Sequence, residues 1–121
     1  MKRDIDLIRR IMLDIEEMPP GARIGVPLYD GVERDVVIAH AVLLHEAGLV
    51  KGSVMHLMNG PPKIQISGLT WEGHDFLAVA KNDTIWEKAK RTVLAPAAGA
   101  TWAVVLEWMK AESMKAFGLS S

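Results

Sequence analysis

Four histidines are the side chains in this chain best suited to acid–base or metal chemistry. His40 and His45 lie five residues apart, about 140° around a helix, so they cannot form the paired zinc ligands that a spacing of four would allow. His74 precedes Asp75, an arrangement that orients a general base, but no nucleophile or second positioning group accompanies it. His56 has no partner suggested by the sequence. We expect His74 to be structural or exposed, and His40 to be a neutral core imidazole that is hydrogen-bonded to backbone.

Glycine pairs, carboxylate clusters and cysteine usage give no stronger sign of catalysis. The pairs Gly21/Gly25 and Gly48/Gly52 lack the Gly-x-Gly-x-x-Gly or Gly-Lys-Ser/Thr context of a phosphate-binding loop. The acidic clusters of the first predicted helix suit a helix N-terminus and a solvated helix face, and a hydrolytic carboxylate pair is the less favoured alternative. The chain has no cysteine, which removes disulfides, thiolate nucleophiles and Cys-containing zinc sites. We therefore expect a protein that is not an enzyme and binds no metal or cofactor.

Length, charge and hydropathy bound the class of protein. A chain of 121 residues predicts one domain, residues 1–121, which can bury a core without a metal. Fourteen basic against fifteen acidic side chains give a net charge of −1, which argues mildly against an electrostatic nucleic-acid binder. The N-terminus has no signal-peptide pattern, and the longest uncharged run, residues 92–106, is shorter than the roughly 18 residues of a membrane span. The sequence predicts a cytoplasmic protein that does not cross a membrane.

Hydrophobic periodicity predicts five helices, because apolar residues recur three and four apart within each segment. The predicted helices cover residues 4–18, 33–47, 71–81, 84–93 and 100–117. The second helix is expected to bury a stripe of Val36, His40, Leu43 and Ala47, with Val37 and Leu44 alongside. The third is expected to bury a set drawn from Trp71, Phe76, Leu77 and Ala80. A capping box formed by Thr84 and Glu87 is expected to start the fourth.

Turn residues predict a β-hairpin between the second and third helices. Gly48 supplies the left-handed conformation that closes a helix, and Asn59-Gly60 is a strong hairpin turn signal. We therefore expect residues 49–58 to pair with residues 63–69, and Thr70 to cap the helix that follows.

The segment between the first two helices predicts little regular structure. Residues 24–29, interrupted by Gly25 and Pro27, predict at most a short edge strand, because proline cannot donate to a central ladder. Together these elements predict an α+β class. We expect a mainly helical, winged-helix-like domain with one β-hairpin, the wing, and added C-terminal helices.

Four motifs spread along the chain form a recognisable set. They are Asp4-Ile5-Asp6-Leu7-Ile8-Arg9, then Leu43-Leu44 with Glu46-Ala47-Gly48-Leu49-Val50, then Leu69-Thr70-Trp71-Glu72-Gly73-His74-Asp75-Phe76-Leu77, and Asp83-Thr84-Ile85-Trp86 with Lys88-Ala89-Lys90. Together they resemble the domain-of-unknown-function family 2513, over nearly the whole chain and less closely in its C-terminal third. The resemblance implies a small protein of bacteria or their phages with a winged-helix-like fold. It implies no activity, cofactor or catalytic residue.

The predicted C-terminal helix, residues 100–117, carries a wide apolar band. Trp102, Leu106 and Met109 share one face, and Trp108 extends the band toward another. The band either packs on the core or meets a second subunit, where Trp and Met are enriched. We favour a dimerisation element with these four residues at the interface, since closed two-fold dimers are the commonest oligomers. The leading prediction is therefore a non-enzymatic interaction module that forms a homodimer.

A DNA-binding regulator of phage or host genes is the alternative function. A recognition helix reaches the major groove with basic and amide side chains, but the helix before the wing has one arginine against three acids. Because carboxylates near phosphates add repulsion, we place DNA binding below protein interaction. The cations expected to contact nucleic acid are Arg34, Lys63, Lys88, Lys90 and Arg91.

Overall fold

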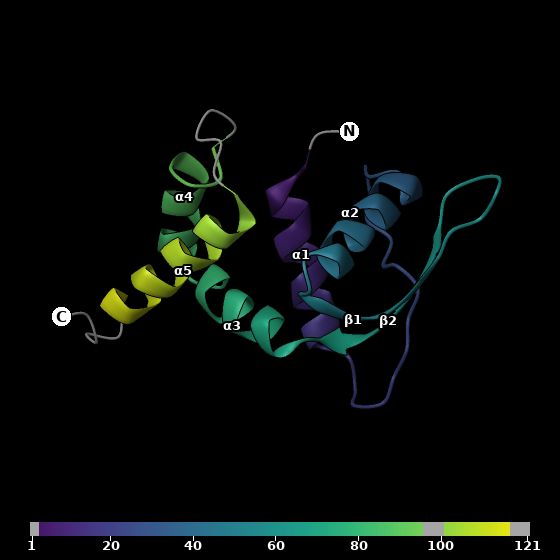
Figure 1. Cartoon of the computed structure of the whole chain (residues 1–121), viewed down its shortest axis with the longest axis horizontal. Helices are drawn as coiled ribbons and strands as arrows, with labels where there is room; N and C mark the ends of the chain where they lie inside the picture. The colour runs from purple at the N-terminus through teal and green to yellow at the C-terminus, as the bar shows by residue number, and fades with distance from the viewer. Residues whose placement is uncertain (1–2, 96–100, 117–121) are drawn as a thin grey trace. The chain divides into compact units, whose positions relative to one another are not determined.

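The computed structural model describes residues 3–95 and 101–116, without the side chains of residues 102, 106, 113 and 116. These residues form five α-helices and one two-stranded antiparallel hairpin (Figure 1). In chain order the elements are α1 Ile5–Glu16, α2 Arg34–Glu46, β1 Val50–Met55, β2 Lys63–Leu69, α3 Trp71–Ala80, α4 Asp83–Arg91 and α5 Trp102–Ala116. The predicted α+β class is confirmed.

The chain divides into two compact units, Met1–His74 and Asp75–Ser121. The first unit holds α1, α2 and the hairpin, and the second holds α4 and α5, while α3 begins in the first and ends in the second. The single domain expected for residues 1–121 stays a prediction. The predicted connector at residues 96–99 lies outside the described residues.

Helix α1 starts at a side-chain cap and ends early. Asp4 Oδ1 accepts the backbone N–H of Leu7 at 3.1 Å, which satisfies one of the unpaired donors of the first turn. The helix ends at Glu16 rather than at Met18, because the N–H of Met18 bonds to the carbonyl of Ile15 and a proline follows. Its buried residues are Leu7, Ile8, Ile11, Met12 and Ile15.

Helix α2 buries a face that is turned from the centre of the one expected. Of the predicted stripe, His40 is buried and Val36, Leu43 and Ala47 are half-buried, whereas Val37 and Leu44, expected alongside the stripe, are buried. The observed buried residues are Val37, Ile38, His40, Ala41 and Leu44. Both faces are apolar, so periodicity alone could not choose between them. The side of α2 that packs against α1 and the hairpin is rotated by about 100° from the predicted stripe, which is the angle between successive residues of a helix.

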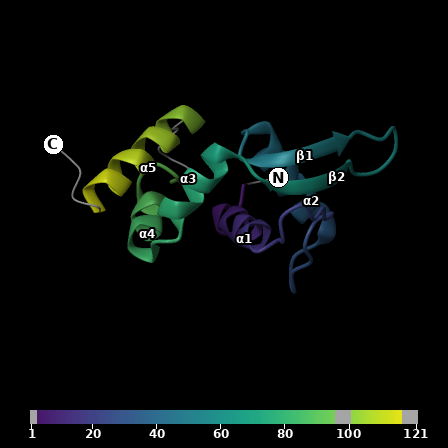
Figure 2. The same cartoon turned by 90° about the horizontal axis from the view of Figure 1, so that it is seen from below.

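The hairpin forms as predicted, with a shorter first strand. Val50 pairs with Leu69 and Met55 with Lys63, so β1 ends three residues before the expected boundary at 58, and a loop of residues 56–62 closes the hairpin. Helices α1 and α2 pack against the strands and against each other, and the loop projects beyond both helices (Figures 1 and 2). The loop is therefore the part of this unit that is least covered by its helices.

A β-bulge and a single bridge complete this small sheet. The register shifts between Lys51 and Gly52, and a Cβ added at Gly52 would lie 2.1 Å from the Gln65 carbonyl oxygen, so only glycine fits. The edge strand expected at residues 24–29 is reduced to one bridge, in which Ile24 and Ile66 exchange backbone hydrogen bonds of 3.0 and 2.7 Å. The glycine and proline that follow Ile24 account for this short pairing.

Helix α3 has the predicted cap but exposes a tryptophan. Thr70 Oγ1 accepts the N–H of Gly73 at 3.0 Å and donates to the Gly48 carbonyl at 2.5 Å. Of the four residues from which the buried set was expected, Trp71 is the one left out, and it is 82% exposed. Trp71 lies about 160° around the helix from Gly73, on the opposite side from the buried residues. Those buried residues include Phe76, Leu77 and Ala80.

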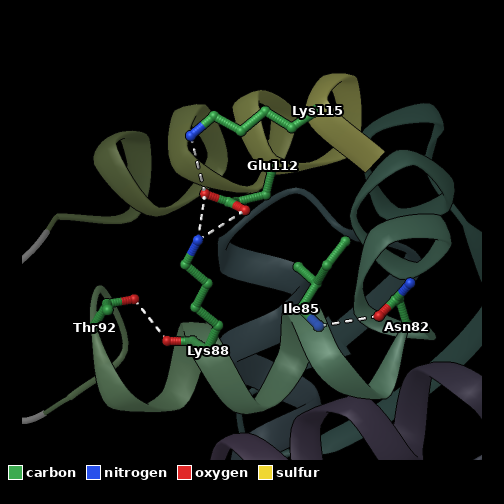
Figure 3. Close-up of polar contacts among 6 residues, drawn as sticks. All are labelled: Asn82, Ile85, Lys88, Thr92, Glu112 and Lys115. Atoms are coloured by element: carbon green, nitrogen blue, oxygen red, sulfur yellow. Dashed lines mark hydrogen bonds and ion pairs between the residues drawn. The ribbon is translucent and has the colours of Figure 1, made fainter. Parts of the chain in front are cut away.

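The second unit is built from the end of α3, α4 and α5. The Phe76 and Trp86 rings meet edge to face with centroids 6.2 Å apart, which joins α3 to α4. Glu112 of α5 is paired with Lys88 of α4 at 3.3 Å and with Lys115 at 3.6 Å (Figure 3). These contacts place an aromatic pair and an ion-pair cluster among the three helices.

The start of α4 differs from the predicted capping box. Asn82, not Thr84, is the N-cap, and its Oδ1 accepts the N–H of Ile85 at 3.0 Å (Figure 3). Asparagine and threonine are both preferred N-cap residues. Because Asn82 and Thr84 lie only two residues apart, the sequence does not determine which of them starts the helix. The helix therefore includes Asp83 in its first turn, where an acid complements the helix dipole.

Candidate functional site

The clearest hollow in the first unit lies beside the hairpin loop. It is a cavity of about 330 Å³ formed by the first turns of α2, residues 25–26, the loop and the start of β2. Its apolar wall consists of Val26, Ile38, Leu57, Pro61, Pro62 and Ile64. Its polar side chains are Arg34, Asn59 and Lys63. A mostly apolar hollow with a few polar groups is the usual form of a binding site.

The charges in this cavity have one sign. Arg34 and Lys63 are its only ionisable groups among the described residues, and both are exposed. Neither side chain has a hydrogen-bond or ion-pair partner within the described part of the chain. Outside the cavity lining, Glu33, the N-cap of α2, makes no side-chain cap hydrogen bond, and Asp35 lies in the first turn, where an acid complements the helix dipole. The two cations that line the cavity attract a negatively charged group.

Exposed apolar side chains surround the same loop. Met58 is 101% exposed and Met55 is 62% exposed, while Leu57 reaches into the cavity and is still 40% exposed. A second hollow of about 380 Å³ includes Met55 and shares Lys63 and Ile64 with the first. Methionine is common at surfaces that adapt to a partner, because its side chain is flexible and polarizable.

A tyrosine ties the segment before α2 to α1. The Tyr29 hydroxyl donates a hydrogen bond to Asp14 Oδ2, and the Arg10 guanidinium lies over the Tyr29 ring, 4.1 Å from its centroid. Burial raises the pKa of Tyr29 well above its usual value, the hydrogen bond to Asp14 and its charge raise it further, and Arg10 lowers it. The phenol therefore stays protonated and holds residues 17–33, which include one side of the cavity, to α1.

His40 is structural, as the sequence indicated. It is fully buried, its Nε2 accepts the backbone N–H of Asp4 at 2.8 Å, and its Nδ1 donates to the Val36 carbonyl at 2.8 Å. Both ring nitrogens are used in a neutral tautomer that joins α1 to α2. His45 is half-buried, and His56 and His74 are exposed. No group of three metal-ligating side chains occurs in the parts of the chain that the structure describes.

The five cations predicted to contact nucleic acid fall into two groups. Arg34 and Lys63 line the same cavity in the first unit. Lys88 and Lys90 lie on α4 and are already paired: Lys88 with Glu112 at 3.3 Å (Figure 3), and Lys90 with Glu87 at 2.9 Å. Arg91 is exposed on the last turn of α4.

The predicted dimer interface is partly buried inside the chain. Met109 is 1% exposed and Trp108 is half-buried, while the side chains of Trp102 and Leu106 lie outside the described residues. On the same helix, Val104 is 51% and Met114 48% exposed. These side chains and Trp108 are the large apolar side chains of α5 that remain at least partly exposed among the described residues.

Sequence reasoning missed the apolar loop. Residues 56–58 are expected to continue β1, whereas Leu57 and Met58 belong to the exposed loop. The sequence did contain a signal for this loop. Leu57 and Met58 directly precede Asn59 and the two prolines of the turn, and apolar residues are unusual at a turn, where polar residues dominate.

Comparisons with known proteins show which family the chain belongs to. A protein of Haemophilus influenzae described as an uncharacterized protein is 35% identical over 94 residues, which cover 77% of this chain and 79% of that protein. No solved structure matches. Among the described residues, no helix is both long and apolar enough to cross a bilayer. The family model described as hypothetical protein DUF2513 matches residues 2–100, and the chain belongs to this family.

Proposed function

We propose that this chain is a non-enzymatic interaction module that binds a protein partner through the hairpin loop, residues 56–62, and the cavity beside it. The observation that carries the proposal is the exposure of Met55, Leu57 and Met58 around one projecting loop. Apolar side chains gathered in this way mark a surface that a partner covers.

The loop's composition supports a protein partner over nucleic acid. Residues 56–62 contain no lysine or arginine, and residues 1–74 carry eight basic against ten acidic side chains. A protein that binds the DNA backbone gains affinity by bringing cations to phosphates, and this unit brings few. The cations that line the cavity beside the loop are Arg34 and Lys63.

A winged-helix-like arrangement is part of the proposal. A helix directly before an antiparallel hairpin, with Ile24 bridged to Ile66 on the other side of β2, supports it. DNA binding stays the alternative, because Arg34 and Lys63 line one cavity at the position between that helix and the wing. Against this alternative, α1 and α2 are separated by residues 17–33 and not by the three- to four-residue turn of a helix-turn-helix.

The test is selection of binding peptides from a displayed random library by the purified chain, compared with binding of a random-sequence DNA duplex. We expect wild type to enrich peptides, and the double variant Leu57→Ser/Met58→Ser to lose that enrichment. Leu28→Ser, which changes a 72% exposed leucine of the first unit that lies outside the loop and the cavity, is the matched control and should retain it. Failure of wild type to enrich peptides, together with salt-sensitive duplex binding, would favour the DNA alternative.

We also propose that α5 supports a homodimer. The open side chains Val104, Trp108 and Met114 support this proposal, and Met109 does not add to the open surface because it is buried. Association with phages and a cytoplasmic location are proposals that rest on the sequence.

A further inference from the structure

We infer that the cavity beside the hairpin loop binds a carboxylate-bearing, apolar segment of the partner protein, with Arg34 and Lys63 holding the carboxylate. This inference rests on the proposed function and names the chemistry of the partner. It joins three features of the first unit: an apolar wall, two cations without partners, and exposed apolar side chains beyond the cavity.

The charges select an anion. Arg34 and Lys63 are the cavity's only ionisable side chains among the described residues, and neither is compensated within that part of the chain. Two like charges at one hollow repel each other, and an anion bound there would offset that repulsion. An arginine fork suits a planar carboxylate particularly well.

The apolar wall selects what accompanies the anion. Val26, Ile38 and the two loop prolines present apolar surface next to the cations. A peptide segment that places an apolar side chain beside an aspartate or glutamate can cover the apolar wall and pair with the cations. A DNA backbone brings no such apolar side chain.

The surface outside the cavity favours a peptide over a free small carboxylate. Met58 is fully exposed next to Leu57 in the chain, and the second hollow, at Met55, shares Lys63 and Ile64 with the first. A small carboxylate would fill the cavity and leave this apolar surface in water. An extended segment would cross from one hollow to the other and cover it.

The experiment uses the full chain and the same displayed peptide library. We expect wild type to enrich peptides that carry Asp or Glu next to an apolar residue. We expect Arg34→Glu/Lys63→Glu to weaken the selected peptides by about tenfold or more in Kd, measured by fluorescence anisotropy, because charge-assisted hydrogen bonds are lost. Arg23→Glu/Lys51→Glu is the matched control: it makes the same charge change at exposed positions of the first unit that do not line this cavity.

The outcomes separate this inference from the proposed function. If peptides are enriched without an acidic preference, and both charge-reversal variants bind them equally, the carboxylate inference is wrong while the interaction module stands. If free succinate displaces the peptides with an equal affinity, the ligand is a small carboxylate and the inference is overturned. If no peptide is enriched, both fail. Circular dichroism of each variant checks that it is folded.

Discussion

At the scale of single residues, hydrogen bonds distinguish structural side chains from free ones. His40 uses both ring nitrogens inside the fold, and Tyr29 uses its hydroxyl to hold residues 17–33 to α1. Arg34 and Lys63 make no such contact within the described residues, although both stand at a cavity. Free polar groups at a hollow are therefore better candidates for binding than the histidines to which residue chemistry first points.

Tyr29 should ionise later in the folded chain than in the unfolded chain. It is the only tyrosine, so an ultraviolet absorbance titration of phenolate reports on this residue alone. The pKa of Tyr29 is raised by burial and by Asp14, so the folded state binds the proton more tightly. The resulting stabilisation is complete below the unfolded-state pKa of about 10 and is lost as the pH rises above it. Asp14→Asn should move the titration toward the unfolded one; an unchanged curve would contradict the role assigned to Asp14.

Gly73→Ala should destabilise the chain. Alanine favours a helix over glycine by about 1 kcal/mol, but a Cβ at this position would lie 2.0 Å from the Leu49 carbonyl oxygen, which is backbone and cannot move away cheaply. Overpacking costs about 1–3 kcal/mol, so we expect the free energy of unfolding to fall. Urea denaturation measures this fall. Gly25→Ala, which has open space around its Cβ, should show little change.

At the scale of elements, the ends are set by local contacts that compete with one another. Thr70 caps α3 as the sequence indicates, but at α4 two good caps stand within three residues and Asn82 is the one used. The end of β1 depends on how far its partner strand extends, and pairing stops at Met55 with Lys63. Element type was thus easier to predict than element boundaries.

Asn82→Ala should therefore destabilise the second unit by about 1 kcal/mol, the usual contribution of a helix N-cap. Thermal or urea unfolding followed by circular dichroism measures the change. Thr84→Ala is the informative control, because Thr84 lies one residue inside the helix start and is exposed. A larger loss for Thr84→Ala than for Asn82→Ala would restore the capping box that the sequence predicts.

At the scale of the whole molecule, the chain has two compact units, and each has a surface that a partner could cover. The first unit exposes Met55, Leu57 and Met58 at its loop, and the second exposes Val104 and Met114 on α5. The family match ends at residue 100, before α5 begins. The loop surface therefore lies within the range of the family match, and the α5 surface lies outside it.

Light scattering should report about twice the chain mass at micromolar concentration if α5 forms the proposed homodimer. Truncating a central interface tryptophan costs about 2 kcal/mol or more, roughly thirtyfold in Kd, so Trp108→Ala should shift the chain toward monomer. Met58→Ala changes an exposed apolar residue in the other unit and should leave the mass unchanged. A wild-type monomer at these concentrations would refute the proposed dimer.

The sequence by itself determined the elements that depend on neighbouring residues. The five helices, the pairing around Asn59-Gly60 and the cap at Thr70 all follow from apolar spacing, turn chemistry and side-chain hydrogen bonds within a few residues. The buried, backbone-bonded state of His40 follows as well, because a polar group on an apolar helix face needs such partners.

Only the tertiary structure decided which faces are buried and which residues meet. The buried face of α2 depends on packing against α1 and the hairpin, because that helix is apolar on more than one side. Trp71 is exposed because Gly73 and Phe76 face inward, an orientation set by the close approach of α3 to Leu49. Arg34 and Lys63 are 29 positions apart in the chain, and no local rule brings them to one cavity. Their meeting depends on contacts between distant segments, which a local pattern of residues does not encode.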